Sequence, residues 1–227
     1  MLIQLLQEDP VVFAVLVPIL LLSLTLHEFA HARIALAFGD PTALKAGRVS
    51  LNPLRHLDPI GTIMLLVAGF GWAKPVPVNP YHIRPLRLGN VMVSLAGPLS
   101  NLCLAVIAGS LLRTVVFLDV EGHLEQSVDL LYMVLTYTLV VNVCLFTFNL
   151  LPVFPLDGSH ILGELLPPHM QGGFSRWQMK YGMIALILLV AGPGLFSRIL
   201  HQPFPDPLGW LFAHAMNITE RAVGLVS

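Results

Sequence analysis

The sequence contains few charged residues and few cysteines. Asp, Glu, Lys and Arg make up 11% of its 227 residues, less than half of their usual share in soluble domains. This shortage excludes a soluble globular protein, and the absence of a basic block gives no sign of a nucleic acid partner. The two cysteines, Cys103 and Cys144, lack the paired spacing of a zinc knuckle or a redox motif. Any metal site must therefore use other residues.

Apolar residues dominate the chain instead, at 56%, and the mean hydropathy is +0.78. A helix needs about 20 mostly apolar residues to cross a bilayer, because all its backbone hydrogen bonds must be made within the segment. Four stretches meet or approach this length, and they cover about residues 10–38, 88–117, 130–154 and 181–200. The sequence therefore predicts a membrane protein with several transmembrane helices.

Four shorter segments are expected to lie at or near the membrane surface. Residues 59–73 are uncharged but short and broken by three glycines, which predicts a re-entrant or interfacial segment or a short fifth span. Residues 43–51 and 72–80 alternate apolar with polar residues and are predicted to flank that segment as short strands. Residues 203–227 suit an amphipathic helix on the membrane. The predicted fold is an all-α polytopic membrane protein with about four to six transmembrane helices and a small membrane-associated β-hairpin or re-entrant segment.

The positions of Lys and Arg predict how the chain lies in the membrane. Between Arg33 and Arg87 there are seven Lys and Arg residues against two acids, whereas residues 119–129 carry four acids and no base. Loops rich in Lys and Arg stay in the cytoplasm. We therefore expect the first loop to be cytoplasmic and the second to lie outside, so that the first and third long helices both end on the cytoplasmic side.

A pattern typical of zinc hydrolases lies near the end of the first long helix. Residues 27–31 read HEFAH, and on a helix the imidazoles of His27 and His31 stand one turn apart on one face, where both can bind one zinc ion. Glu28 lies at the neighbouring edge, where it can take a proton from the attacking water and pass it to a leaving amine. Ionisable groups at membrane depth are costly and by default functional.

A catalytic zinc ion has three protein ligands and an open position, so one ligand must come from elsewhere. The candidates are Asp40, Asp58, Asp157, Glu164 and the seven other histidines. Asp157 differs from the rest because it follows 27 uncharged residues, comes after two prolines that end the helix, and precedes a glycine. His160, one turn further on, remains an alternative ligand or a supporting residue.

Two asparagines lie seven residues apart on the third predicted helix, and therefore roughly on one face. An asparagine inside a membrane needs a hydrogen-bond partner. For Asn142 we expect a contact between helices. Asn149 lies nearer the predicted site, where it can polarise the scissile carbonyl or hold a substrate backbone.

Four motifs together resemble those of the site-2 protease family of intramembrane zinc metalloproteases. They are HEFAH at 27–31, NPLRHLDPIGT at 52–62, GPLSN at 97–101 and NLLPVFPLDG at 149–158. The resemblance covers about residues 20–165. It implies a minimal prokaryotic-type member, a zinc-dependent metalloendopeptidase of the plasma membrane with its active site toward the cytoplasm.

The resemblance also implies a role for particular residues. The two HEFAH histidines and Asp157 would bind one zinc ion per chain, and Glu28 would be the catalytic base. Asn149 and Pro155 would lie in the cleft that holds an unwound substrate. Asn101 would support the core by packing or hydrogen bonding.

The sequence predicts a single domain over residues 1–227, with a catalytic core at about 10–165 and a C-terminal span and interfacial helix at about 177–227. The expected partners are a transmembrane protein substrate and the lipid bilayer, and a homo-oligomer is an option. The alternatives are a zinc transporter or a catalytically silent membrane scaffold. A transporter usually has internal repeats, which this sequence lacks, and gives Glu28 no natural role.

Overall fold

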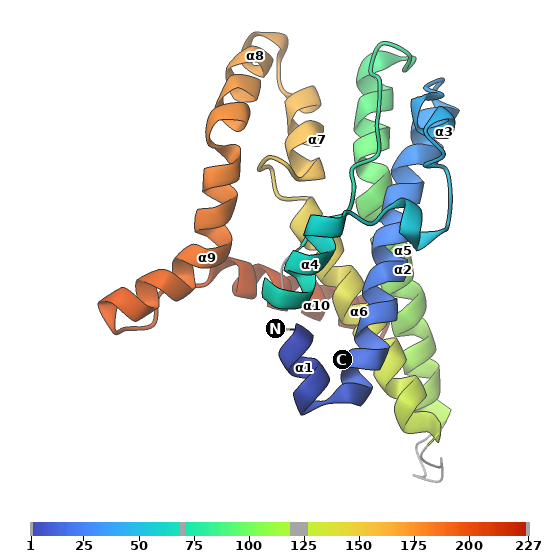
Figure 1. The fold of residues 1–227 in the computed structure, drawn as a ribbon, viewed down its shortest axis with the longest axis vertical. Coiled ribbons are helices and arrows are strands. Elements are labelled where there is room, and N and C mark those ends of the chain that lie inside the picture. The colour runs from blue at the N-terminus through green and yellow to red at the C-terminus, as the bar shows by residue number, and fades with distance from the viewer. Residues whose placement is uncertain (1, 69–70, 119–126, 226–227) are drawn as a thin grey trace.

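The computed structural model describes residues 2–68, 71–118 and 127–225. Every regular secondary-structure element in these ranges is a helix. Four helices are long and apolar enough to cross a membrane (Figure 1). They are α2 (Pro10–Ala37), α5 (Leu86–Leu118), α6 (Ser127–Asn149) and a continuous helix made of α8 (Pro168–Trp177), the π-helical turn η2 (Gln178–Gly182) and α9 (Met183–Leu200). The protein is thus a helical membrane protein, as its sequence predicts.

The other helices of the described chain are shorter. They are α1 (Leu2–Glu8), α3 (Thr42–Lys45), the 3-10 turn η1 (Pro53–Arg55), α4 (Pro59–Ala68), α7 (Asp157–Leu165) and α10 (Pro207–Ala222). α4 has 10 residues and is therefore about 15 Å long, half of the hydrocarbon thickness of about 30 Å. As a helix it is too short to cross the membrane. α10 falls in the predicted C-terminal surface helix, whose place on the membrane stays a prediction.

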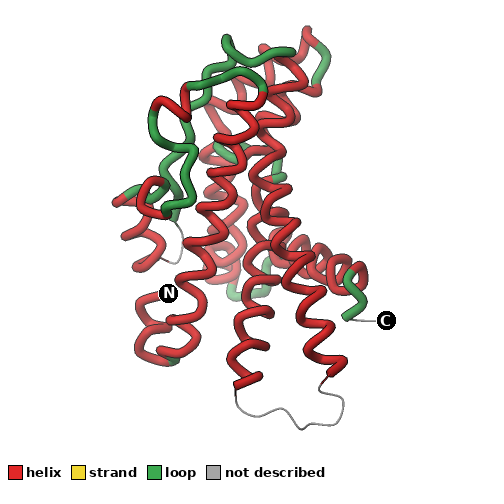
Figure 2. The backbone as a smooth tube through the Cα atoms, turned by 90° about the vertical axis from the view of Figure 1, so that its right-hand side faces the viewer, coloured by secondary structure: helices red, strands yellow, loops and turns green. Residues whose placement is uncertain are grey.

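The predicted β-hairpin does not form. The described residues contain no strand, as Figure 2 shows, and residues 43–51 begin within helix α3. The second segment, residues 72–80, contains three prolines, which lack the backbone N–H that a strand ladder needs. One isolated antiparallel bridge, between Leu57 and Ala73, is found in the described chain. The Arg48 side chain joins the two segments instead, because it donates hydrogen bonds to two backbone carbonyls of the second.

Helices α2, α5 and α6 pack together at the centre of the molecule (Figures 1 and 2). The contact between α5 and α6 forms a hydrophobic core, whose buried residues are Ala105, Ala108, Leu112, Leu135, Leu139 and Val143. Alanine is small enough to let two helix backbones approach closely, which favours helix packing in a membrane. α10 packs beside this core through Ala215 and Met216.

The start and the end of α2 follow from local sequence signals. Asp9 caps the start, because its side chain accepts a hydrogen bond from the backbone N–H of Val12 (3.0 Å), and Pro10 needs no donor at the first helical position. Gly39 lies just beyond the end with a φ of 98°, which glycine adopts without strain. The helix therefore continues through residues 27–31, which carry the HEFAH motif.

A buried aspartate connects the end of α2 to the segment before α5. Asp40 is fully buried and accepts hydrogen bonds from the backbone N–H and hydroxyl of Thr42 and from the backbone N–H of Asn79 (2.7 Å). Its carboxylate also lies 3.2 Å from Nδ1 of His82. Burial alone would raise the pKa of Asp40, but these hydrogen bonds outweigh burial and hold the pKa below its ordinary value. Asp40 is therefore ionised at neutral pH.

We predict that Asp40→Asn lowers the free energy of unfolding by roughly 1–3 kcal/mol at pH 7, because either amide orientation places an NH2 group against another donor. A carboxylate with a lowered pKa stabilises the fold above its unfolded pKa of about 4, and this contribution is lost as the pH falls through the lowered value. The difference between variant and wild type should therefore shrink in acid. Thermal unfolding in detergent between pH 7 and pH 3 measures it.

Asp58→Asn is the matched control. Asp58 accepts a hydrogen bond from the backbone N–H of Gly61 (2.8 Å) at the start of α4, and asparagine caps a helix about as well as aspartate. An Asp40→Asn protein as stable as the Asp58→Asn protein at pH 7 would contradict the prediction.

Candidate metal centre

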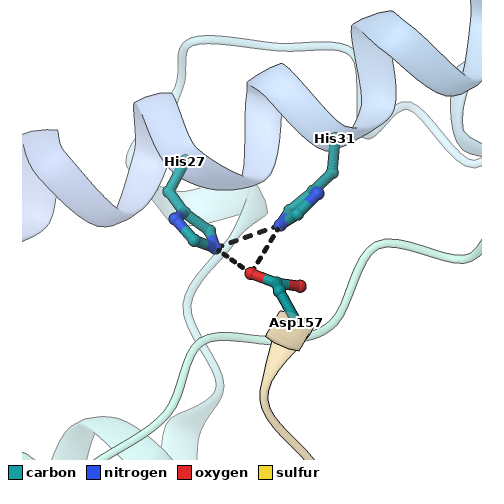
Figure 3. A group of neighbouring side chains, drawn as sticks. All are labelled: His27, His31 and Asp157. Atoms are coloured by element: carbon teal, nitrogen blue, oxygen red, sulfur yellow. Dashed lines mark hydrogen bonds and ion pairs between the residues drawn. The ribbon is translucent and has the colours of Figure 1, made fainter. Parts of the chain in front are cut away.

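Two histidines of α2 and one aspartate of α7 meet in a buried cluster (Figure 3). His27 and His31 are 5% and 8% exposed, and their Nε2 atoms are 3.0 Å apart. Asp157, the first residue of α7, approaches them so that its Oδ2 atom lies 3.2 Å from Nε2 of His27 and 3.3 Å from Nε2 of His31. Residues far apart in the sequence thus present one ligand atom each to a common point.

The size of this triangle fits a zinc ion. Zinc binds imidazole nitrogen and carboxylate oxygen at about 2.0–2.2 Å in tetrahedral geometry, which places the ligand atoms roughly 3.3 Å from one another. The three ligand atoms here are separated by 3.0, 3.2 and 3.3 Å. Three protein ligands leave one tetrahedral position free, as in catalytic zinc sites.

Hydrogen bonds at the far side of each ring direct the lone pairs of both histidines into the cluster. Nδ1 of His31 lies 2.7 Å from the backbone carbonyl oxygen of Val93, which can only accept, so Nδ1 carries the hydrogen. Nδ1 of His27 lies 2.7 Å from Oδ1 of Asn101 in the same arrangement. In a neutral imidazole the other nitrogen, Nε2, then holds a lone pair. This is how proteins orient metal-binding histidines.

The carboxylate oxygen of the cluster also lacks a donor. Oδ2 of Asp157 is buried and makes no hydrogen bond with any described residue. Two lone pairs and a carboxylate oxygen therefore face one another in a largely buried cluster, which is unfavourable unless a cation lies between them. The donor set, two imidazoles and one carboxylate, is one that zinc uses in hydrolases.

A chain of buried amides holds the His27 ring in place from behind. Asn101 donates from Nδ2 to Oδ1 of Asn142 (2.9 Å), and Asn142 donates from Nδ2 to the hydroxyl of Ser23 (2.9 Å). Both asparagines are fully buried, and Ser23 is 2% exposed. Because these residues lie on α5, α6 and α2, the network joins all three central helices. The expected contact of Asn142 between helices is therefore present.

Gly97 leaves room for an ion beside the histidines. A Cβ atom at this position of α5 would lie 2.3 Å from Nε2 of His31 and 2.5 Å from Nε2 of His27. The absence of a side chain thus keeps open the space into which both nitrogens point. This explains the glycine of the GPLSN motif, whose asparagine is the partner of His27.

Helix α7 is held at its far end by residues of α5. Arg87 donates from Nε to the carbonyl oxygen of Glu164 (2.6 Å) and from Nη2 to that of Leu165 (2.9 Å), and Asn90 donates to the Glu164 side chain (2.7 Å). A cation at the carboxyl end of a helix satisfies free carbonyls and interacts favourably with the helix dipole. These bonds fix the helix whose first residue is Asp157.

The other proposed site residues are close to the three clustered residues in the sequence. Their side chains do not belong to the group of three ligand atoms. Glu28 follows His27 on α2, is partly exposed, and has no hydrogen bond or ion pair with a described residue. Asn149 is the last residue of α6 and donates to the carbonyl oxygen of Leu145 on its own helix (2.9 Å). Pro155 is exposed in the loop before α7. His160 is also exposed and is not part of the cluster.

Within the described ranges, this is the one group of three metal-ligand side chains whose ligand atoms come close together. The other acidic candidates have different contacts, as Asp40 accepts from loop residues, Asp58 caps α4 and Glu164 accepts from α5. The sequence did not reveal the role of Val93, since it acts through its backbone carbonyl, which no residue type signals. Gly97 could have been suspected as the small residue of GPLSN.

The chain is similar to known proteins. Peptidase family M50 matches residues 115–191, which include Asp157. YwhC of Bacillus subtilis (strain 168), named as a zinc metalloprotease, is 44% identical over 180 residues, or 78% of this chain and 80% of YwhC. Rip2 of Mycolicibacterium smegmatis, also named as a zinc metalloprotease, is 32% identical over 189 residues, or 81% of this chain and 69% of Rip2. No solved structure matches the chain.

We predict that Asp157→Ala loses most of its zinc, because two imidazoles alone cannot complete the ligand set. Elemental analysis of protein purified in detergent should find about one zinc per chain in the wild type and little in the variant. Asp129→Ala is the control, as Asp129 is exposed in the first turn of α6. Full zinc content in the Asp157→Ala protein would exclude Asp157 as a ligand.

A second prediction concerns the open space beside the histidines. Gly97→Ala should weaken zinc binding by about tenfold or more, since the new methyl group would fall within 2.5 Å of both Nε2 atoms. Competition with a chelator measures the affinity. Gly163→Ala on α7 is the control, because a Cβ there meets its nearest neighbour at 3.7 Å. Equal zinc affinity of the two variants would show that the ion does not lie beside Gly97.

Proposed function

Because the chain belongs to peptidase family M50, the site-2 protease family, we propose that this zinc metalloendopeptidase cleaves a membrane protein substrate within or near its transmembrane segment. The observation that carries the proposal is the meeting of three ligand atoms on α2 and α7, with α2 long and apolar enough to span the membrane. A hydrolytic site at this depth can reach a neighbouring helix that a soluble protease cannot.

His27, His31 and Asp157 would hold the ion. When bound, zinc supplies a Lewis acid that polarises the scissile carbonyl and lowers the pKa of a nearby water. The protein's part is to fix the ligands, and the hydrogen bonds to Val93 and Asn101 support this by setting the tautomer and orientation of each ring. The space kept open by Gly97 supports an ion at this point.

Glu28 is the proposed catalytic base. Its carboxylate would take a proton from the water that attacks the scissile carbonyl and deliver that proton to the leaving amine, so that the peptide bond breaks with no net change in the charge of the enzyme. Two features support this role. Glu28 is adjacent in sequence to a proposed ligand, and no hydrogen bond or ion pair joins its side chain to a described residue.

The substrate needs partners for its backbone. A transmembrane helix must unwind locally before water can attack, and each opened N–H and C=O group inside a membrane costs several kcal/mol if it has no partner. Asn149 and Pro155 are proposed to line the cleft where this happens. They lie at the two ends of the stretch that joins α6 to Asp157, and Pro155 is exposed there.

We place the protein in the plasma membrane with its active site toward the cytoplasm. The seven Lys and Arg residues between Arg33 and Arg87 support this orientation, because such loops remain in the cytoplasm. The transporter and the silent scaffold gain no support, since the described chain has one cluster of metal-ligand residues and the relatives are named as proteases.

We predict that Glu28→Gln retains zinc but cleaves a transmembrane substrate at least about a hundredfold more slowly, because glutamine cannot accept the proton. The assay is cleavage in detergent or liposomes, with zinc content measured on the same preparations. Glu8→Gln, at the exposed end of α1, is the control for loss of one negative charge. Cleavage at the wild-type rate by the Glu28→Gln protein would refute the proposed mechanism.

A further inference from the structure

The long helix over Pro168–Leu200 touches the rest of the molecule sparingly. Only 11% of its most apolar 18-residue stretch is buried, against 22% to 28% for the other three candidate spans. In Figure 1 it lies to one side of the central helices. Among the described residues, one side chain of this helix, Gln178, makes hydrogen bonds to the chain before α7.

Gln178 bonds to the loop that precedes Asp157. Its side chain is buried, with Oε1 accepting from the backbone N–H of Phe154 (2.8 Å) and Nε2 donating to the carbonyl oxygen of Pro152 (2.7 Å). Both ends of one carboxamide thus hold two backbone groups of a single loop. Phe154 is three residues before Asp157.

Two backbone groups of this loop have Gln178 as their hydrogen-bond partner. The amides of Leu151, Val153 and Leu156 donate to carbonyls within the loop or the end of α6, at 2.8 to 3.1 Å. The Phe154 amide instead donates to Gln178. Without that side chain, the N–H of Phe154 and the C=O of Pro152 would lose these partly buried partners, and the loop would have to move to find others.

The local helix geometry is adapted to this contact. Gln178–Gly182 is a π-helical turn, a departure from the α-helix that often occurs at functional sites. A Cβ atom at Gly182 would lie 2.8 Å from Cβ of Phe154 and 2.9 Å from Oε1 of Gln178. The missing side chain lets the helix approach the loop closely enough for Gln178 to reach it.

We infer that Gln178 is a positioning residue, which fixes the loop from Pro152 to Phe154 and thereby the place of Asp157 opposite the two histidines. This inference rests on the proposed metal site. Arg87 holds α7 at its carboxyl end, and Gln178 holds the chain just before its amino end, so Asp157 is restrained from both sides. The fourth long helix thus contributes to the metal centre without supplying a ligand.

The test compares zinc affinity in the full-length protein, measured by chelator competition in detergent. Gln178→Met keeps the shape of the side chain but removes both hydrogen bonds, and we expect its zinc affinity to fall about tenfold or more, as for other residues that orient ligands. Gly182→Ala should act in the same direction, because its methyl group would push the helix away from Phe154.

The same helix offers matched controls. Gln171 lies two turns before Gln178, and Gln171→Met removes its partly buried hydrogen bond to the carbonyl oxygen of Leu166 (3.0 Å). Gly173→Ala adds a methyl group where no atom lies within 4 Å. Both should bind zinc as the wild type does. The unfolding temperature of the zinc-free proteins separates a loss of stability from a loss of ligand position.

Three results decide whether Gln178 positions Asp157. Weaker zinc binding by Gln178→Met and Gly182→Ala, with controls unchanged, supports the inference. Wild-type affinity in Gln178→Met, even with a lower unfolding temperature, would overturn it and leave Gln178 a purely structural residue. A wild type without zinc would refute the proposed metal site itself, and the role of Gln178 with it.

Discussion

The hydrogen bond between Nδ1 of His27 and Oδ1 of Asn101 is the contact on which the site depends. It determines which nitrogen of the ring faces the cluster, and it does so from inside a helix bundle where water cannot substitute. Asn101 can hold this orientation because its amide group is bonded in turn to Asn142. The polar network that joins the central helices is therefore also the support of the proposed metal centre, so the same hydrogen bonds serve helix packing and the site.

Helix α5 contributes more to the site than its lack of a ligand suggests. One turn after another, it provides the carbonyl of Val93, the open space at Gly97 and the amide of Asn101. These positions are four residues apart, which places them along one face of the helix. The two histidines of α2 are therefore oriented by contacts with α5, while α7 brings the carboxylate from the other side.

Much of this arrangement could be predicted because it leaves strong signals in the sequence. Long apolar runs predict the spans, and HEFAH with a distant aspartate after a long uncharged run predicts which residues meet. The β-hairpin was wrong because alternation of residue types was taken as a strand signal, with the prolines of residues 72–80 expected only to limit that strand to a sheet edge. Three residues that cannot donate leave too few hydrogen bonds for a strand there. The carbonyl of Val93 and the hydrogen bonds of Gln178 could not be predicted. Backbone groups carry no residue signal, and a glutamine just before the predicted span at 181–200 does not reveal its partner.

The separation of the ligands along the chain has a consequence for biosynthesis. His27 and His31 lie on α2, which leaves the ribosome before α5 and α6, whereas Asp157 follows α6. Until α7 has been made, the nascent chain lacks Asp157 and so has only two of the three proposed ligands, which falls short of the three protein ligands of a catalytic zinc site. The proposed site therefore cannot be complete while α2 and α5 are being inserted, and hydrolysis there has to wait for the later part of the chain.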